Sequence, residues 1–459
     1  MDFARRRQRL TGLVDGPILL LGNGTQPRNL PMNRLPFRQD STFLYFTGCA
    51  EPDAAAILDG DGFELFLTPT DDEDALWHGP QPGIEARGAA LGADRTSPVS
   101  ALLERVSPGV RTLAVPDPVR NAKFAERIGQ PLWFGVHHGH DDLVDAVIQL
   151  RRSKDADEIA ELRKAAEVTR EALEATMAAT RPGSHERDLW TLFEAVLRLR
   201  GCNPGYETIL TQSGEVLHHH GHADALEAGR MVLLDGGGER TDSGYTVDIT
   251  RTWPVSGTFS PRQRAAYEAV LAAQEASIAL CRPGVPYREV HDASCRLLAR
   301  FLVDEGLVSG DVDGVVERGA HALFFPHGVG HHLGLDVHDL ENFGDRPSYP
   351  EGVGRPEGFG TRNLRLDLPL EPGWVVTIEP GFYVVPAILA NAALREQFAG
   401  VVDFAAAEAW TGFGGIRIED DVHVTNGGPE VLTSVPKAVS EVEALVGSGP
   451  SVVERRCGP

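Results

Sequence analysis

Two stretches of the sequence follow one pattern: Gly229-Arg-Met-Val-Leu-Leu-Asp235 and Gly373-Trp-Val-Val-Thr-Ile-Glu379. Each begins with glycine, continues as a short apolar run typical of a buried strand, and ends on a carboxylate. A second apolar segment with a central acid follows each of them, with Asp248 in the first case and Glu419 in the second. The matched acids indicate two related hairpins.

The segments that precede these hairpins also match. Arg181-Pro-Gly183 separates two helical patterns, and Arg282-Pro-Gly284 separates two more before the second hairpin. Helix, helix and hairpin thus occur twice, which predicts two similar halves that face each other around four acids. The first helix carries an apolar stripe at steps of three or four residues: Ile159, Leu162, Ala166, Thr169, Leu173 and Met177.

The first 150 residues alternate short apolar runs with helical stretches such as 98–106, which predicts an α/β domain of moderate size. At about residue 150 a charged stretch opens a new helix, and we place the domain boundary there. The expected class is therefore α/β (α+β), with domains 1–150 and 151–459. The runs expected as strands of the first domain are residues 17–22, 55–60, 64–69, 111–116 and 131–136.

Charge and composition exclude several classes of protein. The chain has 459 residues, with 66 Asp and Glu against 43 Lys and Arg, and its net charge is −23. Such an acidic surface repels phosphate backbones and anionic lipids, so we expect neither nucleic acid nor a membrane as partner. No apolar run reaches the roughly 20 residues that cross a bilayer, and the N-terminus is too interrupted for a signal peptide. Five scattered cysteines without a C-x-x-C pair are typical of a cytoplasmic protein.

The acids of the hairpins need a counter-charge. If residues 245–251 form a strand, the apolar side chains share one face and Asp248 lies on the other. The cations nearby are chiefly Arg251 and Arg417. Because four carboxylates outnumber them, a pair of divalent metal ions is the simplest source of the missing positive charge.

Histidine would complete such a set of ligands. A glycine-rich stretch, which we expect to be a loop or strand, contains four of them: His327, His331, His332 and His338. A second group, residues 218–222, precedes the first hairpin. One imidazole with four carboxylates suits two Mn²⁺ ions, with Co²⁺ or Zn²⁺ as alternatives. Such a pair can hold a bridging hydroxide and polarise a carbonyl, so the expected reaction is hydrolysis of a peptide or ester.

Five blocks carry a family resemblance: residues 35–48, 235–255, 327–339, 377–383 and 415–422. Among them are His327-Gly-Val-Gly-His-His-Leu-Gly-Leu-Asp-Val-His-Asp339 and Thr377-Ile-Glu-Pro-Gly-Phe-Tyr383. The sequence resembles the Xaa-Pro aminopeptidases (aminopeptidase P) and prolidases, which share the creatinase/methionine aminopeptidase "pita-bread" fold. The resemblance implies an N-terminal creatinase-like domain over 1–150. It also implies a pita-bread metallopeptidase domain with duplicated halves over 151–459, in agreement with the repeat.

The resemblance also implies which residues would bind metal. Asp235 would chelate one ion, and Asp248 and Glu419 would bridge both. His331 and Glu379 would complete the site of the other ion. Glu379 would in addition accept and donate a proton beside the bridging hydroxide.

Further roles follow from the same resemblance. His218 matches the position that steadies the reacting carbonyl, and His338 matches a histidine that contacts the substrate. Arg417 is the arginine beside the bridging glutamate. His327 matches an outer histidine of the motif, and Tyr206 matches an aromatic residue of the substrate pocket.

Two segments depart from the family pattern. The first hairpin is two residues longer through 239–243, an even insertion that keeps both acids on the same face. Residues 341–370 are longer than usual, and we expect a loop near the site entrance. Creatinase lacks the metal ligands, whereas all of them are present here, so hydrolysis of creatine is a weak interpretation.

The implied function is a dimetal exopeptidase that releases the N-terminal residue from peptides with proline in second position. A prolidase restricted to dipeptides is the nearest alternative. Residues 248–254 and 45–48 favour the aminopeptidase, whereas Gly330 before His331 is closer to prolidases. More distant alternatives are a scaffold protein with an inactive site and a hydrolase of organophosphates or esters. The family resemblance also implies a homodimer or homotetramer.

Overall fold

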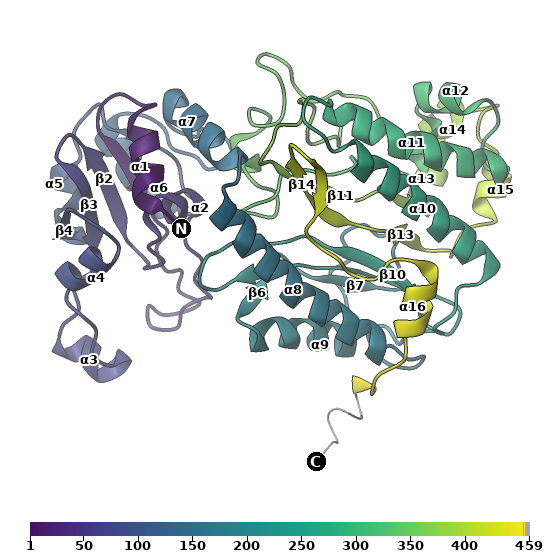
Figure 1. The fold of residues 1–459 in the computed structure, drawn as a ribbon, viewed down its shortest axis with the longest axis horizontal. Coiled ribbons are helices and arrows are strands. Elements are labelled where there is room, and N and C mark those ends of the chain that lie inside the picture. The colour runs from purple at the N-terminus through teal and green to yellow at the C-terminus, as the bar shows by residue number, and fades with distance from the viewer. Residues whose placement is uncertain (453, 455–459) are drawn as a thin grey trace. The chain divides into compact units, whose positions relative to one another are not determined.

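The computed structural model describes residues 1–452 and 454, and this part of the chain forms two compact units (Figure 1). Unit 1 contains Met1–Arg152 and Leu340–Pro347. Unit 2 contains Ser153–Asp339 and the described residues from Ser348 onward. Among the described helices, none combines the length and the apolar character needed to span a membrane.

Unit 1 is built on a five-stranded mixed sheet with the strand order β4-β3-β2-β1-β5. The central pairs are antiparallel, and the two edge strands run parallel to their neighbours. Its strands are β1 (Ile18–Leu21), β2 (Ala55–Asp59), β3 (Gly62–Leu67), β4 (Arg95–Pro98) and β5 (Arg111–Thr112). Its helices are α1 (Phe3–Thr11), α2 (Ser41–Thr47), α3 (Asp72–His78), α4 (Ile84–Ala90), η1 (Val99–Ala101), α5 (Leu102–Arg105), α6 (Pro118–Ile128), α7 (Asp141–Arg152) and η3 (Glu341–Phe343).

The alternation of strands and helices predicted for this unit is confirmed, with three errors. The run 111–116, expected as one strand, forms a strand only over Arg111–Thr112. Residues 131–136 form no strand, because Trp133 and Val136 are exposed and only an isolated bridge joins Trp133 to His137. Strand β4 was not predicted, because its sequence, Arg-Thr-Ser-Pro, contains no apolar run. Its four residues are half-buried. An edge strand with one covered side does not need the apolar pattern of a central strand.

Unit 2 contains two pairs of long helices, and a predicted Arg-Pro-Gly turn separates the two helices of each pair. The pairs are α8 (Ala156–Ala179) with α9 (Glu186–Leu199), and α10 (Pro261–Leu280) with α11 (Tyr287–Asp304). The predicted apolar stripe of α8 is buried along its whole length. Capping boxes at Asp155 and Ser260 begin α8 and α10. The shorter helices are α12 (Val312–Glu317), η2 (Ala320–Leu323), α13 (Pro386–Leu389), α14 (Ala392–Gln397), α15 (Phe404–Glu408) and α16 (Val439–Leu445).

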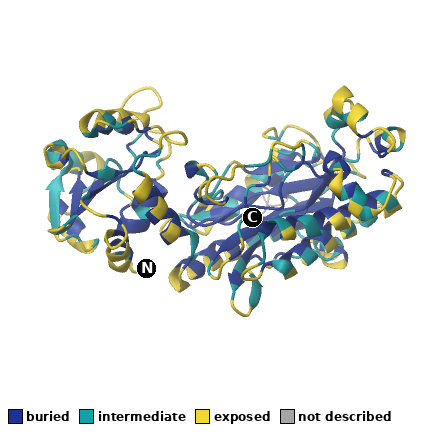
Figure 2. Cartoon of the chain, turned by 90° about the horizontal axis from the view of Figure 1, so that it is seen from above, coloured by how far each residue is buried: buried dark blue, intermediate teal, exposed yellow. Residues whose placement is uncertain are grey.

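The strands of unit 2 form two matching three-stranded sheets, β10-β8-β7 and β11-β14-β15, and two short pairs, β12-β13 and β6-β9. Figure 1 shows strands β7, β10 and β13 between the two helix pairs, and the strands are the buried part of the unit in Figure 2. The predicted duplication is confirmed, because each helix pair leads into an antiparallel hairpin. The strands are β6 (Cys202–Pro204), β7 (Ile209–Thr211), β8 (Met231–Asp235), β9 (Gly238–Arg240), β10 (Thr250–Pro254), β11 (Val375–Ile378), β12 (Gly381–Tyr383), β13 (Gly415–Arg417), β14 (Asp420–Thr425) and β15 (Gly428–Val431).

The strand predicted over residues 245–251 begins later than expected. Strand β10 starts at Thr250, opposite Asp235, and the preceding residues form no regular ladder. Side chains of both alternating sets are buried in 245–250, so this segment has no solvent face. Asp248 is held instead by its backbone N–H, which donates to Oδ2 of Asp421 at 3.1 Å. Glu419 likewise lies between two strands, after β13 and before β14.

We expect the buried stripe of α8 to be essential for the stability of unit 2. Leu173 is fully buried, and Leu173→Ala should lower the free energy of unfolding by about 2–5 kcal/mol. Leu199, at the end of α9, is 83% exposed, and the same substitution there should change it by less than about 0.5 kcal/mol. Urea unfolding followed by circular dichroism compares the two. Equal midpoints for the two variants would show that α8 does not pack as described.

Candidate metal centre and active site

A cavity of about 590 Å³ lies within unit 2 and is lined by residues of both halves. It brings together all ten residues to which the family resemblance assigns a role. These are Tyr206, His218, Asp235, Asp248, His327, His331, His338, Glu379, Arg417 and Glu419.

Three buried side chains form the centre of this group. Asp248, His331 and Glu419 each offer a ligand atom, and these atoms lie within 4.8 Å of one another. Glu379 joins them, because its Oε1 lies 3.6 Å from Nε2 of His331. Nε2 of His331 is also 3.4 Å from Oδ2 of Asp248. These separations are those of side chains that can share a metal ion.

The orientation of His331 is fixed by its other ring nitrogen. Nδ1 lies 2.9 Å from the carbonyl oxygen of His332. Because a carbonyl oxygen only accepts, Nδ1 carries the proton and Nε2 presents its lone pair to the acids. The backbone N–H of His331 donates to Oγ1 of Thr377 in β11 at 3.1 Å.

Gly330 allows this loop to lie against β11. A Cβ atom at this position would be 2.0 Å from the carbonyl oxygen of Thr377 and 2.3 Å from the hydroxyl of Tyr287. The glycine-rich stretch forms a loop, as predicted, with an isolated bridge from His332 to Val376. The absence of a side chain at residue 330 therefore determines where the imidazole of His331 lies.

Asp235 is held by two neighbours. Nη2 of Arg417 lies 2.6 Å from its Oδ2, and the hydroxyl of Tyr206 lies 2.6 Å from its Oδ1. The same hydroxyl also hydrogen-bonds to Asp248. Tyr206 thus lines the cavity, but its polar end faces two carboxylates.

Arg417 lines the cavity and pairs with one of its acids, whereas Arg251 does neither. The guanidinium of Arg417 donates to Asp235, to the hydroxyl of Tyr383 at 2.9 Å and to Oγ1 of Thr250 at 3.1 Å. Arg251, which the sequence offered as a second counter-charge, pairs instead with Asp420 at 2.7 Å. The expectation for Arg251 was wrong, because its side chain leaves the face on which the four acids meet.

The remaining negative charge fits a divalent cation. Burial raises the pKa of Glu379 to about 8, and it also raises the pKa values of Asp235, Asp248 and Glu419. Oε1 of Glu419 is buried and, within the described part of the chain, has no hydrogen-bond partner. Carboxylate oxygens with one imidazole are ligands for a hard or borderline ion, and these residues therefore fit the metal pair inferred from the sequence.

Three further histidines lie around these acids. Nε2 of His327 is 2.9 Å from the hydroxyl of Tyr383, and burial lowers the pKa of His327 to about 3. The ring of His338 packs edge-on against His331, with centroids 4.2 Å apart. His218 is exposed towards the cavity, and partial burial followed by the charge of Arg417 lowers its pKa.

Sequence reasoning missed the residues that support the acids. Thr250 donates from Oγ1 to Oε2 of Glu419 at 2.7 Å, and Asp421 accepts the N–H of Asp248. Both lie two residues from a predicted ligand, so strand periodicity could have found them. The long segment 341–370 contributes four cavity residues: Phe359, Arg362, Asn363 and Arg365.

Comparisons with known proteins agree with this geometry. Residues 160–426 match the model of metallopeptidase family M24, and residues 3–112 match that of the aminopeptidase P N-terminal domain. The chain is 34% identical to an Xaa-Pro aminopeptidase of Escherichia coli over 97% of both chains. It is 31% identical to a human Xaa-Pro dipeptidase over 97% of this chain and 93% of that protein. Its fold matches the aminopeptidase PepP of Pseudomonas aeruginosa with a TM-score of 0.81 at 32% identity, over 97% of this chain and 98% of the other.

The contact at Gly330 predicts a selective effect on metal binding. Gly330→Ala should displace the loop and His331 and weaken Mn²⁺ binding by at least about tenfold, as loss of a positioning contact does in other metal sites. Gly427→Ala serves as the control, because a Cβ there meets only Oγ1 of Thr425 at 3.6 Å. Titration calorimetry measures both affinities. If Gly330→Ala binds Mn²⁺ with unchanged affinity, the position of this loop does not determine metal binding.

Proposed function

This chain belongs to metallopeptidase family M24, and on that basis we propose that it is an Xaa-Pro aminopeptidase. The enzyme would release the N-terminal residue from peptides that carry proline in second position. One observation carries the proposal: four carboxylates and an imidazole from two duplicated halves meet in one cavity, where Arg417 forms an ion pair with one of the four acids. That arrangement is suited to a pair of divalent metal ions.

The proposed ligands divide between two ions. Asp235 would bind one, His331 and Glu379 would bind the other, and Asp248 with Glu419 would bind both. The short separations among His331, Asp248, Glu379 and Glu419 support the part of this division that concerns the second ion. We propose Mn²⁺ as the ion, because the set is rich in oxygen and has no thiolate. When bound, the pair supplies a nucleophile from water and polarises the scissile carbonyl.

The residues of the chain itself would then move protons and hold the peptide. Glu379 points its two oxygens in different directions, Oε1 towards His331 and Oε2 at 3.7 Å from His327. One oxygen can therefore ligate while the other accepts and returns a proton. His218 and His338 line the cavity and can donate to the carbonyl of the substrate. His327 and Tyr206 are proposed as contacts of the bound peptide.

Arg417 would set the charge of the centre. Its guanidinium lies 2.6 Å from Asp235 and neutralises part of the negative charge of that carboxylate. Hydrogen bonds to Tyr383 and Thr250 fix its orientation. A lysine could not hold all three partners in one plane, because only a guanidinium has that fork of donors. Arg417 therefore keeps Asp235 oriented towards the cavity.

The alternative function is an Xaa-Pro dipeptidase. The human relative with that name and the two arginines of the cavity wall, Arg362 and Arg365, favour it. A cation close to the reacting bond would attract the free carboxylate of a dipeptide, whereas a longer peptide has an amide there. Substrate length therefore distinguishes the two functions.

Three further proposals concern the molecule as a whole. We propose domains 1–150 and 151–459, supported by the N-terminal match at 3–112 and the M24 match at 160–426. We propose a cytoplasmic location, supported by the buried, free cysteines Cys49, Cys202, Cys281 and Cys295; Cys457 lies outside the described residues. A homodimer or homotetramer stays a prediction, which light scattering would test.

The first expected outcome concerns metal and peptide length. Metal-stripped protein should be inactive, and Mn²⁺ should restore cleavage of Ala-Pro-Ala-Ala at the bond before proline. Chromatography of the products, with Ala-Pro as the matched dipeptide, measures this. Cleavage of Ala-Pro alone would establish the dipeptidase, and cleavage of neither peptide would contradict both functions.

The second expected outcome separates proton transfer from metal binding. Glu379→Gln should lower kcat by at least about 10²-fold while it retains metal, because the amide cannot accept the proton. Asp248→Ala should lose both metal and activity. Glu371→Gln is the control, since this acid is exposed just before β11 and should keep both. Full activity of Glu379→Gln or Asp248→Ala would mean that these acids do not carry the reaction.

A further inference from the structure

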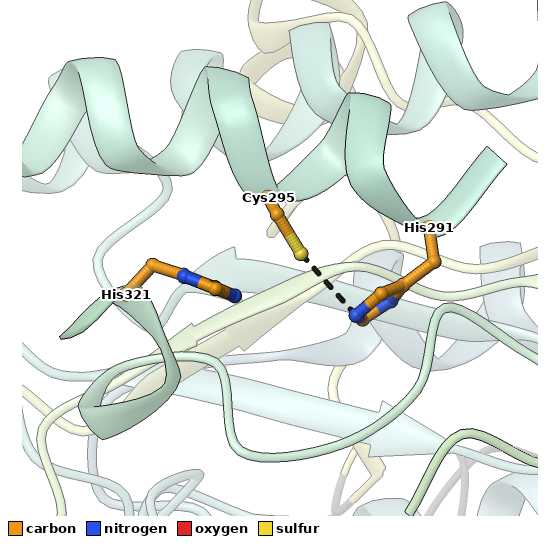
Figure 3. A group of neighbouring side chains, drawn as sticks. All are labelled: His291, Cys295 and His321. Carbon is orange, nitrogen blue, oxygen red and sulfur yellow. Dashed lines mark hydrogen bonds between the residues drawn. The ribbon is translucent and has the colours of Figure 1, made fainter. Parts of the chain in front are cut away.

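A second cluster of metal-ligand residues lies in unit 2, apart from the acids. His291 and Cys295 are one turn apart on α11, and His321 lies in η2 (Figure 3). Sγ of Cys295 is 3.3 Å from Nε2 of His291. One ligand atom from each of the three residues lies within 4.8 Å of the other two. In Figure 3 the three side chains point towards one another.

The cluster is enclosed and has unused nitrogens. His291 is 3% exposed, Cys295 is 1% and His321 is 8%. Nδ1 of each histidine is buried, and neither atom has a hydrogen-bond partner in the described part of the chain. The nitrogen of His291 that faces the thiol is Nε2, which among the described residues has only Sγ as its partner. A buried polar atom without a partner costs free energy, so two such atoms in one enclosed cluster favour a bound ligand.

The donor set differs from that of the acid centre. One thiol and two imidazoles are soft or borderline ligands, whereas the acid centre has four carboxylates and one imidazole. Burial lowers the pKa of His291 to about 3 and that of His321 to about 4, so both rings are neutral near pH 7 and can offer a lone pair. Mn²⁺ prefers oxygen ligands and would not select this cluster.

We propose that His291, Cys295 and His321 bind one thiophilic metal ion of the class of Zn²⁺ and Cu⁺, separately from the metal centre of the acids. Binding would form one sulfur–metal and two nitrogen–metal bonds and release the thiol proton to water. With Cu⁺ the site would be neutral, and with Zn²⁺ it would carry one positive charge. Because the cluster is closed to solvent, the ion enters while the chain folds.

The ion would connect α11 to the start of the loop that carries His331. Helix η2 ends at Leu323, and the loop follows directly. The ring of Phe325 packs between the cluster and the cavity, 5.5 Å from the centroid of His291 and 4.8 Å from that of His327. The site therefore stabilises the base of the loop without touching the substrate.

Cobalt provides a test that is independent of peptidase activity. Co²⁺ bound to a thiolate gives a sulfur-to-metal charge-transfer absorption in the near ultraviolet, which carboxylate and imidazole ligands do not give. The full chain produced in Co²⁺-supplemented medium should show this absorption. Cys295→Ser should abolish it and lower the bound cobalt by one ion per chain. Cys281→Ser, at another buried thiol, should change neither.

Folding and metal identity are controlled in the same experiment. Retention of Mn²⁺-dependent activity by Cys295→Ser would show that the variant folds, and His321→Gln offers a second variant if it does not. Zn²⁺ and Cu⁺ in place of cobalt, each measured by native mass spectrometry, show which ion is retained. The proposal is overturned if the wild-type protein shows no sulfur absorption, or if Cys295→Ser and His321→Gln both leave it unchanged.

Discussion

The two hairpins of unit 2 are joined by the side chain of Arg251. Its guanidinium is fully buried and comes from β10 of the first half. It donates to Asp420 at 2.7 Å and to the carbonyl oxygens of Glu419, Val435 and Pro436, which all belong to the second half. Although burial alone would raise it, Arg251 and Lys437 hold the pKa of Asp420 below its usual value. This network fixes the backbone from which Glu419 extends into the cavity. A buried ion pair contributes little net stability, so its main effect is on how the halves are positioned.

Three successive acids show how the fold divides its charges. Asp420 faces the cations, whereas Glu419 and Asp421 lie on the side of Asp248. Burial, followed by the charge of Asp248, raises the pKa of Asp421. Because side chains alternate along an extended chain, Asp420 pairs with cations on one side. Within the described part of the chain, the charges of its two neighbours, Glu419 and Asp421, are left without a salt-bridge partner on the other side. The proposed metal binding would depend on this unequal division, since an arginine on the other face would satisfy the same acids without an ion.

The sequence predicted most of the fold and of the site composition. The apolar stripe of α8 and the two hairpins follow from spacing alone, because burial of one face imposes a fixed period. The residues of the cavity were found largely by family resemblance. Periodicity places Asp421 on the same face as Glu419, but it does not identify Asp248 as its partner. The partner of Arg251 was likewise not predictable, since both contacts join segments far apart in sequence. The strand predicted over residues 131–136 is wrong, because an apolar run can also form a turn. Trp133 and Val136 are exposed in this turn.

The proposed ligands are spread along the chain, so a partly synthesised chain contains only some of them. Asp235 is the first of them and Glu419 the last, and the two come from different halves of unit 2. The first half holds only two of the five and has no histidine among them. A nascent or truncated chain that ends before β14 would therefore lack a complete centre, however well its first helices had formed. Hydrolytic activity would therefore require that both halves have been synthesised.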